Sequence, residues 1–187
     1  MRKGKISENV LKRSVLKKIR THRDEVTSGA GVGTDCAVLT FGEGYDTVIS
    51  TTPVTAPTED ISTYAIPMSL NNIAAAGAEP IGVMLAVVLP EKTEESELQT
   101  MMERAEEVCR LNNVEIIGGH TEVLPAITEP IMTVTGVGKR RGRATDLLRG
   151  VKPGQDIVIS KWIGIEGTIR LAKGRRKELC MRYPAAM

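Results

Sequence analysis

Aromatic residues are scarce in this sequence, making up 3% of its 187 residues. Proteins that bind single-stranded nucleic acids usually stack the bases on aromatic rings, so this scarcity argues against such a partner. The formal net charge is only +2, which is too small to indicate a nucleic-acid or membrane partner. We therefore expect neither kind of partner, and a core built from aliphatic residues and methionine.

Cysteines are also few, and Cys36, Cys109 and Cys180 lie far apart. Without a Cys-x-x-Cys motif, the sequence indicates neither a zinc knuckle nor a redox pair, and it suits a reducing compartment. No apolar run reaches membrane length, and the N-terminus lacks the apolar segment of a signal peptide. These features predict a cytoplasmic protein.

Basic residues gather in three places, at residues 1–23, 139–143 and 170–177. The simpler interpretation, which we favour, is that they cover solvated helix faces and a loop. The alternative is a rim that steers anions toward a site.

The hydrophobic pattern predicts an α+β (α/β-like) fold with a mixed, mostly antiparallel sheet and helices on one face. The other face has no long polar pattern, so we expect it to be covered by a second copy of the chain. Helices are expected over residues 6–20, over 60–76 with Pro67 as a break or kink, from an N-cap at Thr93 to Asn112, and briefly after residue 166. Strands are expected over residues 36–40, 47–51, 81–89, 114–117, 131–137 and 156–160.

Four segments beside these strands combine small residues with polar groups, and we interpret them as loops: residues 31–35, 50–55, 72–80 and 118–122. Glycine lets backbone N–H groups approach an anion closely, and hydroxyl and carboxylate oxygens can hold a hydrated metal ion. Taken singly, each segment is more often a structural turn, a helix end or a hydrogen-bonded histidine. Gly77 is expected to close the second helix in the left-handed conformation.

Taken together, six motifs in this order resemble those of the aminoimidazole ribonucleotide (AIR) synthase superfamily. The motifs are Gly33-x-Asp35-x-Ala37, residues 50–55, the segment from Asn72 to Pro80, residues 89–91, residues 118–123 and residues 161–168. The forms at 118–123 and 161–168 are most similar to the hydrogenase-maturation branch of that superfamily.

The resemblance implies that residues 1–150 form a domain that binds ATP and dimerises, and that 151–187 begin a second domain that is truncated here. The sheets of two copies would pair into a β-barrel, with ATP and magnesium at their interface. Another maturation protein is a further implied partner. No catalytic residue is assigned. The implied ATP-contacting residues are Gly33, Asp35, Thr51, Thr52, Asn72, Gly77, Gly119, His120, Thr121 and Lys161, and the implied metal ligands are Asp35, Asn72 and Glu122.

The sequence departs from the family pattern at Thr52, Asn72 and His120, where aspartate is usual, whereas Asp35 is retained. Threonine and asparagine offer Mg²⁺ only neutral oxygens, and histidine prefers softer metals. Two hypotheses follow. The protein uses ATP to phosphorylate and activate an oxygen or amide acceptor, or it is a catalytically reduced homologue that acts as a dimeric binding module.

Overall fold

The structure is a computed structural model that describes residues 4–32, 37–141 and 152–159, with single residues at 164, 167, 175, 178 and 181. The chain divides into two units, Met1–Leu147 and Leu148–Met187. All the helices and strands whose bounds are given below belong to the first unit. Within the described residues, no helix is long and apolar enough to cross a membrane.

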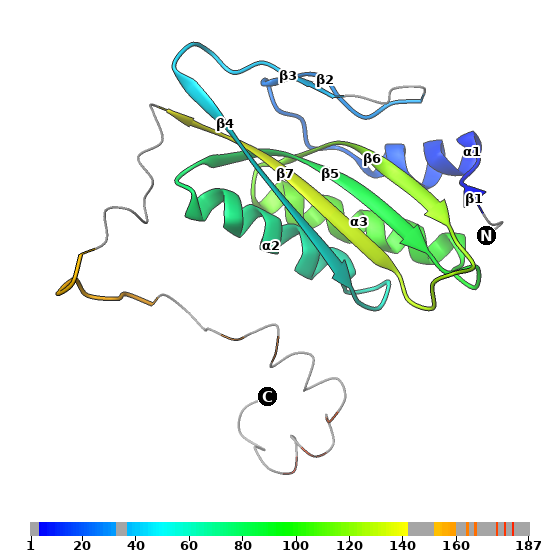
Figure 1. Cartoon of the computed structure of the whole chain (residues 1–187). Helices are drawn as coiled ribbons and strands as arrows, with labels where there is room; N and C mark the ends of the chain where they lie inside the picture. The colour runs from blue at the N-terminus through cyan, green and yellow to red at the C-terminus, as the bar shows by residue number, and fades with distance from the viewer. Residues whose placement is uncertain are drawn as a thin grey trace. The chain divides into compact units, whose positions relative to one another are not determined.

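A five-stranded sheet forms the centre of the first unit, in the order β1-β6-β5-β7-β4. Strands β5 and β6 are parallel, and the other neighbours are antiparallel. Both long helices pack on one side of this sheet (Figure 1). The predicted fold class is therefore confirmed, whereas the dimeric β-barrel stays a prediction. The elements of the sheet and its helices are β1 (Gly4–Lys5), β4 (Tyr45–Thr55), α2 (Ile61–Ala75), β5 (Glu79–Leu89), α3 (Glu95–Leu111), β6 (Glu115–Val123) and β7 (Ile131–Arg141).

The N-terminal segment is helical but irregular, with α1 at Glu8–Val10, a π-helical turn at Leu11–Val15 and a 3-10 turn at Leu16–Lys18. Ser7 caps it by accepting a hydrogen bond from the Val10 N–H at 3.4 Å, so the predicted helix start is confirmed. Strands β2 (Val26–Ser28) and β3 (Val38–Leu39) follow and pair with each other.

Alternate residues of the strands point into the core under α2 and α3. Val83, Leu85 and Val87 of β5 are at most 3% exposed, and Val134 of β7 is fully buried. The predicted apolar stripe of α3 is confirmed, because all four of its members are buried there: Leu98, Met102, Ala105 and Cys109. The core is therefore aliphatic, as the composition requires.

The end of α2 is closed as predicted by Gly77, whose φ is +70°. Its N–H donates to the Ala74 carbonyl at 2.9 Å, and the Ala78 N–H donates to the Ile73 carbonyl at 3.2 Å. The Arg140 guanidinium donates to the Ala76 carbonyl at 2.7 Å, which adds a cation at the negative end of the helix dipole. Helix α2 also runs through Pro67, which lies inside it.

Two segments expected as loops are strands. Residues 50–55 belong to β4, which continues through Pro53 because it is an edge strand, where a missing N–H can face solvent. Residues 118–122 belong to β6, so the predicted strand was cut too short. The basic residues 139–141, expected in a loop after the strand over 131–137, are the last residues of β7.

Two other local predictions were wrong. Glu94, not Thr93, is the N-cap of α3, and its backbone N–H donates to the Glu97 carboxylate at 2.8 Å. The strand expected over 156–160 is absent from the described residues 156–159, where Ile157 is 91% exposed. Pro153–Gly154 do form the expected turn, and the helix expected after residue 166 falls mostly outside the described residues.

Candidate functional site

A pocket of about 430 Å³ lies where β5, β6 and β7 meet the N-terminal segment. One wall is aliphatic and includes Leu11, Val15 and Leu16 of the helical segment. The strands add hydroxyls and backbone to the lining. Of the residues predicted as site residues, the pocket brings together Gly119, His120 and Thr121, and it adds Ala30, Gly31, Thr133 and Thr135.

Gly119 has a backbone conformation that suits only glycine, with φ at +152°. A Cβ at this position would lie 2.1 Å from the Leu85 carbonyl oxygen of the neighbouring strand. The glycine in this motif is therefore required by the packing of β6 on β5, and it leaves the backbone bare at the pocket.

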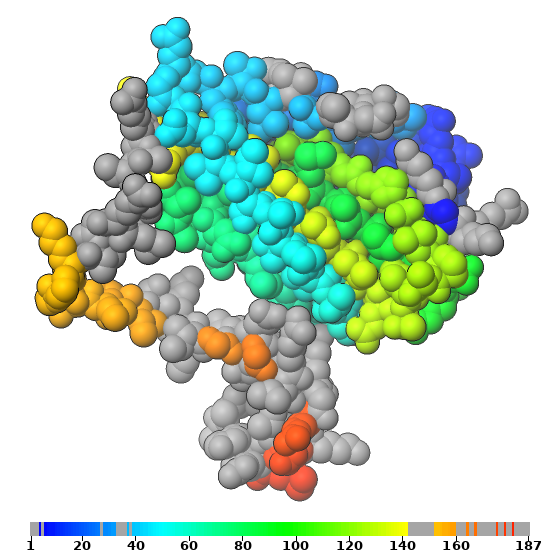
Figure 2. Space-filling view, viewed as in Figure 1, coloured from blue at the N-terminus to red at the C-terminus, as the bar shows by residue number. Residues whose placement is uncertain are grey.

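His120 and Thr121 point to opposite sides of the sheet, as neighbours in a strand must. His120 is 45% exposed, and its Nε2 lies 3.7 Å from a carboxylate oxygen of Glu122. Thr121 is 7% exposed, on the side that the helices cover. The side of the sheet that carries His120 is called the open face here, and Figure 2 shows β4, β7 and β6 uncovered over much of it.

Thr51 also lies on the open face. Its hydroxyl is 3.0 Å from that of Thr135, the residue opposite it on β7. Since Thr135 lines the pocket, Thr51 lies one strand away from it, on the same open face as His120.

Thr52 and Asn72 form a separate cluster on the helix-covered side. The Asn72 amide nitrogen donates to Ser50 Oγ at 3.0 Å and to Thr52 Oγ1 at 3.5 Å. Every group in this cluster is neutral, and the amide is turned as a donor, so the cluster does not fit Mg²⁺. Glu122 lies on the other side of the sheet, so the predicted pair of metal ligands Asn72 and Glu122 is not brought together.

Within the described residues, no group of three or more His, Cys, Asp or Glu side chains could hold a metal ion. Gly33, Asp35 and Lys161 lie outside the described residues. Residues 28–35 are called the glycine-rich segment here. Gly31, two positions before Gly33, lines the pocket, so this segment reaches it. Gly77 is the helix cap described above and is absent from the pocket lining.

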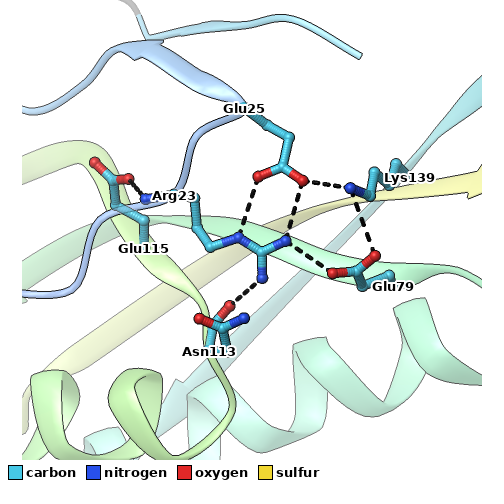
Figure 3. A network of polar contacts seen from close by, with 6 residues as sticks. All are labelled: Arg23, Glu25, Glu79, Asn113, Glu115 and Lys139. Carbon is cyan, nitrogen blue, oxygen red and sulfur yellow. Dashed lines mark hydrogen bonds and ion pairs between the residues drawn. The ribbon is translucent and has the colours of Figure 1, made fainter. Parts of the chain in front are cut away.

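A network of polar contacts around the nearly buried Arg23 was missed from the sequence (Figure 3). The Arg23 guanidinium, 9% exposed, donates two hydrogen bonds of 3.1 Å to Glu25 and one of 2.8 Å to Glu79. Lys139 also pairs with both carboxylates. Hydrogen bonds from Arg23 and Lys139 lower the pKa of Glu25 to about 2. These two cations are neutralised by partners, so neither is free to steer an anion.

A family model, described as AIR synthase related protein, N-terminal domain, matches residues 33–139. A hydrogenase expression/formation protein of Methanocaldococcus jannaschii is 29% identical over 174 residues, which cover 88% of this chain and 50% of the relative. Thiamine-monophosphate kinase of Bacillus subtilis is 28% identical over 138 residues, covering 68% and 41%. The chain thus spans about half the length of these relatives.

Among solved structures, the hydrogenase maturation protein HypE of E. coli is similar with a TM-score of 0.66 and 18% identity, covering 79% of this chain and 48% of that one. A structure of HypE in complex with ATP is similar with a TM-score of 0.59 and 23% identity, covering 70% and 38%. At this identity the likeness establishes the fold. The family model covers more than half of the chain, so the chain belongs to the AIR synthase related family.

Proposed function

We propose that residues 1–150 form the nucleotide-binding and dimerisation domain of an enzyme that uses ATP to phosphorylate an oxygen or amide acceptor. A phosphorylated oxygen leaves far more easily than hydroxide, which is what such activation achieves. Support comes from the family, from relatives named as kinases and from the similar protein solved with ATP. The observation that carries the proposal is the pocket at which Gly31 meets the Gly118–His120 segment.

The lining of the pocket suits a nucleoside better than a bare phosphate. The described lining contains no Lys, Arg, Asp or Glu, and His120 is its one ionisable side chain. Leu11, Val15 and Leu16 offer apolar surface to a base, and the Thr121 hydroxyl, on the same helix-covered side of the sheet, can bond a polar edge. We assign the phosphates to the glycine-rich segment that continues from Gly31 toward Gly33 and Asp35.

A second copy of this chain is the partner we propose for the open face. Ile49 of β4 is 64% exposed there, and Met84, Val88, Ile131 and Val137 of the neighbouring strands are half-buried. Apolar side chains in a row over adjacent strands mark an interface more often than a solvated surface. Residues 151–187 would begin the second domain, and a further maturation protein stays a partner predicted from the family.

A catalytically reduced binding module is the second candidate, and the Asn72 cluster favours it. Its hydroxyl and amide groups already bond one another, and no carboxylate replaces the aspartates usual at positions 52 and 72. A domain of this kind would dimerise without using ATP.

Calorimetric titration with ATP, with and without Mg²⁺, decides between the two. The first proposal predicts saturable binding that His120→Ala weakens, while Glu59→Ala, an exposed substitution outside the pocket lining, leaves it unchanged. Absence of binding at millimolar ATP overturns it. In that event, binding gained by a Thr52→Asp/Asn72→Asp variant supports the reduced module, because the lost affinity would then lie in those two side chains.

A further inference from the structure

Arg23 ties together three parts of the chain that are distant in sequence. Its guanidinium bonds Glu25 before β2, Glu79 at the start of β5 and, at 2.6 Å, the Asn113 carbonyl between α3 and β6. Charge-assisted bonds from a planar, nearly buried guanidinium fix direction as well as distance. The chain at Arg23 is therefore held against the start of both parallel strands.

Glu115, the first residue of β6, also bonds the chain at His22 and Arg23. It is 5% exposed, its Oε2 accepts from the Arg23 backbone N–H at 2.6 Å, and its Oε1 lies 3.5 Å from His22 Nδ1. The carboxylate also lies near the glycine-rich segment, because a Cβ added at Gly29 would lie 3.1 Å from Oε1. A buried carboxylate destabilises the folded state unless its oxygens keep their hydrogen-bond partners, which here come from the chain around Arg23.

The stretch so fixed leads directly into the pocket. Strand β2 starts at Val26 and ends at Ser28, and Ala30 and Gly31 beyond it line the pocket. Arg23 and Glu115 are themselves absent from the lining. Their contacts therefore set where the glycine-rich segment lies without touching what the pocket holds.

We infer that Arg23 and Glu115 are positioning residues, which hold residues 29–31 at the distance from β6 at which the glycine-rich segment can contact a nucleotide. The inference rests on the proposed function, because it concerns the same pocket. It assigns to the network a role in ligand affinity, beyond the stability that any buried ion pair contributes.

The test compares Arg23→Gln and Glu115→Gln with Arg104→Gln in the full chain. Arg104 is the control, because its guanidinium, although 42% exposed, also bonds a backbone carbonyl, that of Glu59, lies 3.8 Å from the Asp60 carboxylate and is absent from the pocket lining. Melting temperature, ATP affinity and hydrogen exchange of residues 26–32 are measured for each variant. Exchange is read at a temperature at which all variants are folded.

We expect Arg23→Gln to weaken ATP binding at least tenfold and to speed exchange in residues 26–32. Glu115→Gln keeps one oxygen for the Arg23 N–H, so its effects should be smaller than those of Glu115→Ala. Arg104→Gln should lower the melting temperature and leave both other measurements unchanged. The inference is overturned if Arg23→Gln and Arg104→Gln bind ATP equally well.

Failure of the proposed function gives a different result. If the unmodified chain binds no ATP, the exchange measurement still applies, and unchanged protection of residues 26–32 in Arg23→Gln and Glu115→Gln overturns the positioning role. Should Arg23→Gln fail to fold, Glu115→Gln and Glu115→Ala decide by the same two measurements.

Discussion

The close packing of α2 on β7 depends on two glycines, and substituting them tests the fold. A Cβ at Gly138 would lie 2.4 Å from Ile73 Cγ2 and 2.7 Å from the Glu79 carbonyl oxygen. Ile73 is fully buried, and the carbonyl belongs to the neighbouring strand of the same sheet. Neither atom can retreat without moving α2 or β5, so Gly138→Ala should be destabilising.

Overpacking of a core costs about 1–3 kcal/mol, and we expect Gly138→Ala near the upper end because one contact is with backbone. For a chain of this size, 3 kcal/mol corresponds to a melting temperature lower by roughly 6–12 °C. Gly136→Ala should cost only about 1 kcal/mol, since its Cβ would meet the Ser69 hydroxyl at 2.7 Å, which can rotate away. At Gly42 the nearest atom is a Tyr45 ring carbon at 3.9 Å, so Gly42→Ala is the control.

Urea unfolding followed by far-ultraviolet circular dichroism ranks the three variants. The expected order of lost stability is Gly138→Ala, then Gly136→Ala, then Gly42→Ala at no more than about 0.5 kcal/mol from the parent. If Gly138→Ala is as stable as Gly42→Ala, then α2 does not pack on β7 at the spacing described.

Three other predictions concern single side chains. Arg23 and Lys139 lower the pKa of Glu25 to about 2 from its ordinary 4.5, so the stability that Glu25 contributes is present above pH 4.5 and lost toward pH 2. The difference in melting temperature between the parent and Glu25→Gln should therefore shrink as the pH falls over that range. A constant difference would contradict this prediction. Ile49→Lys should halve the molar mass measured by light scattering if the open face joins two copies, and a parent that is already monomeric rules that interface out. Burial raises the pKa of the Cys109 thiol to about 12. In a Cys36→Ser/Cys180→Ser variant, this thiol should therefore react with a disulfide reagent at least a hundredfold faster in urea than in the native state. Rapid labelling of the native state would show that α3 opens readily.

Helices and strands with a long, regular pattern of apolar residues were predictable from the sequence. The stripe on α3, from Leu98 to Cys109, repeats over about three turns, and the apolar run at residues 81–89 is rich in β-branched residues, which favours a strand. Both depend on near neighbours in the chain, which the sequence shows directly. Gly77 was predictable for the same reason, since a helix end is a local event.

What could not be predicted depends on neighbours that are distant in sequence. Pro53 reads as a loop residue until β4 is known to be an edge strand. The network of Arg23 joins residues up to 114 positions apart, as in the Lys139–Glu25 pair, and no local pattern connects them. Misreading residues 50–55 as a loop also hid that Thr51 and Thr52 point to opposite sides of the sheet.

That separation changes the meaning of the three missing aspartates. Thr52 and Asn72 lie together on the helix-covered side, where they bond each other, and His120 lies on the open face with Glu122. Since the sheet stands between them, no single ion contacts all three within one copy of the chain. The substitutions at 52 and 72 therefore form one coupled change and the one at 120 another. The effects of restored aspartates on the free energy of ATP binding should be coupled between positions 52 and 72. The effect at position 120 should add to theirs, as it does for residues without shared partners.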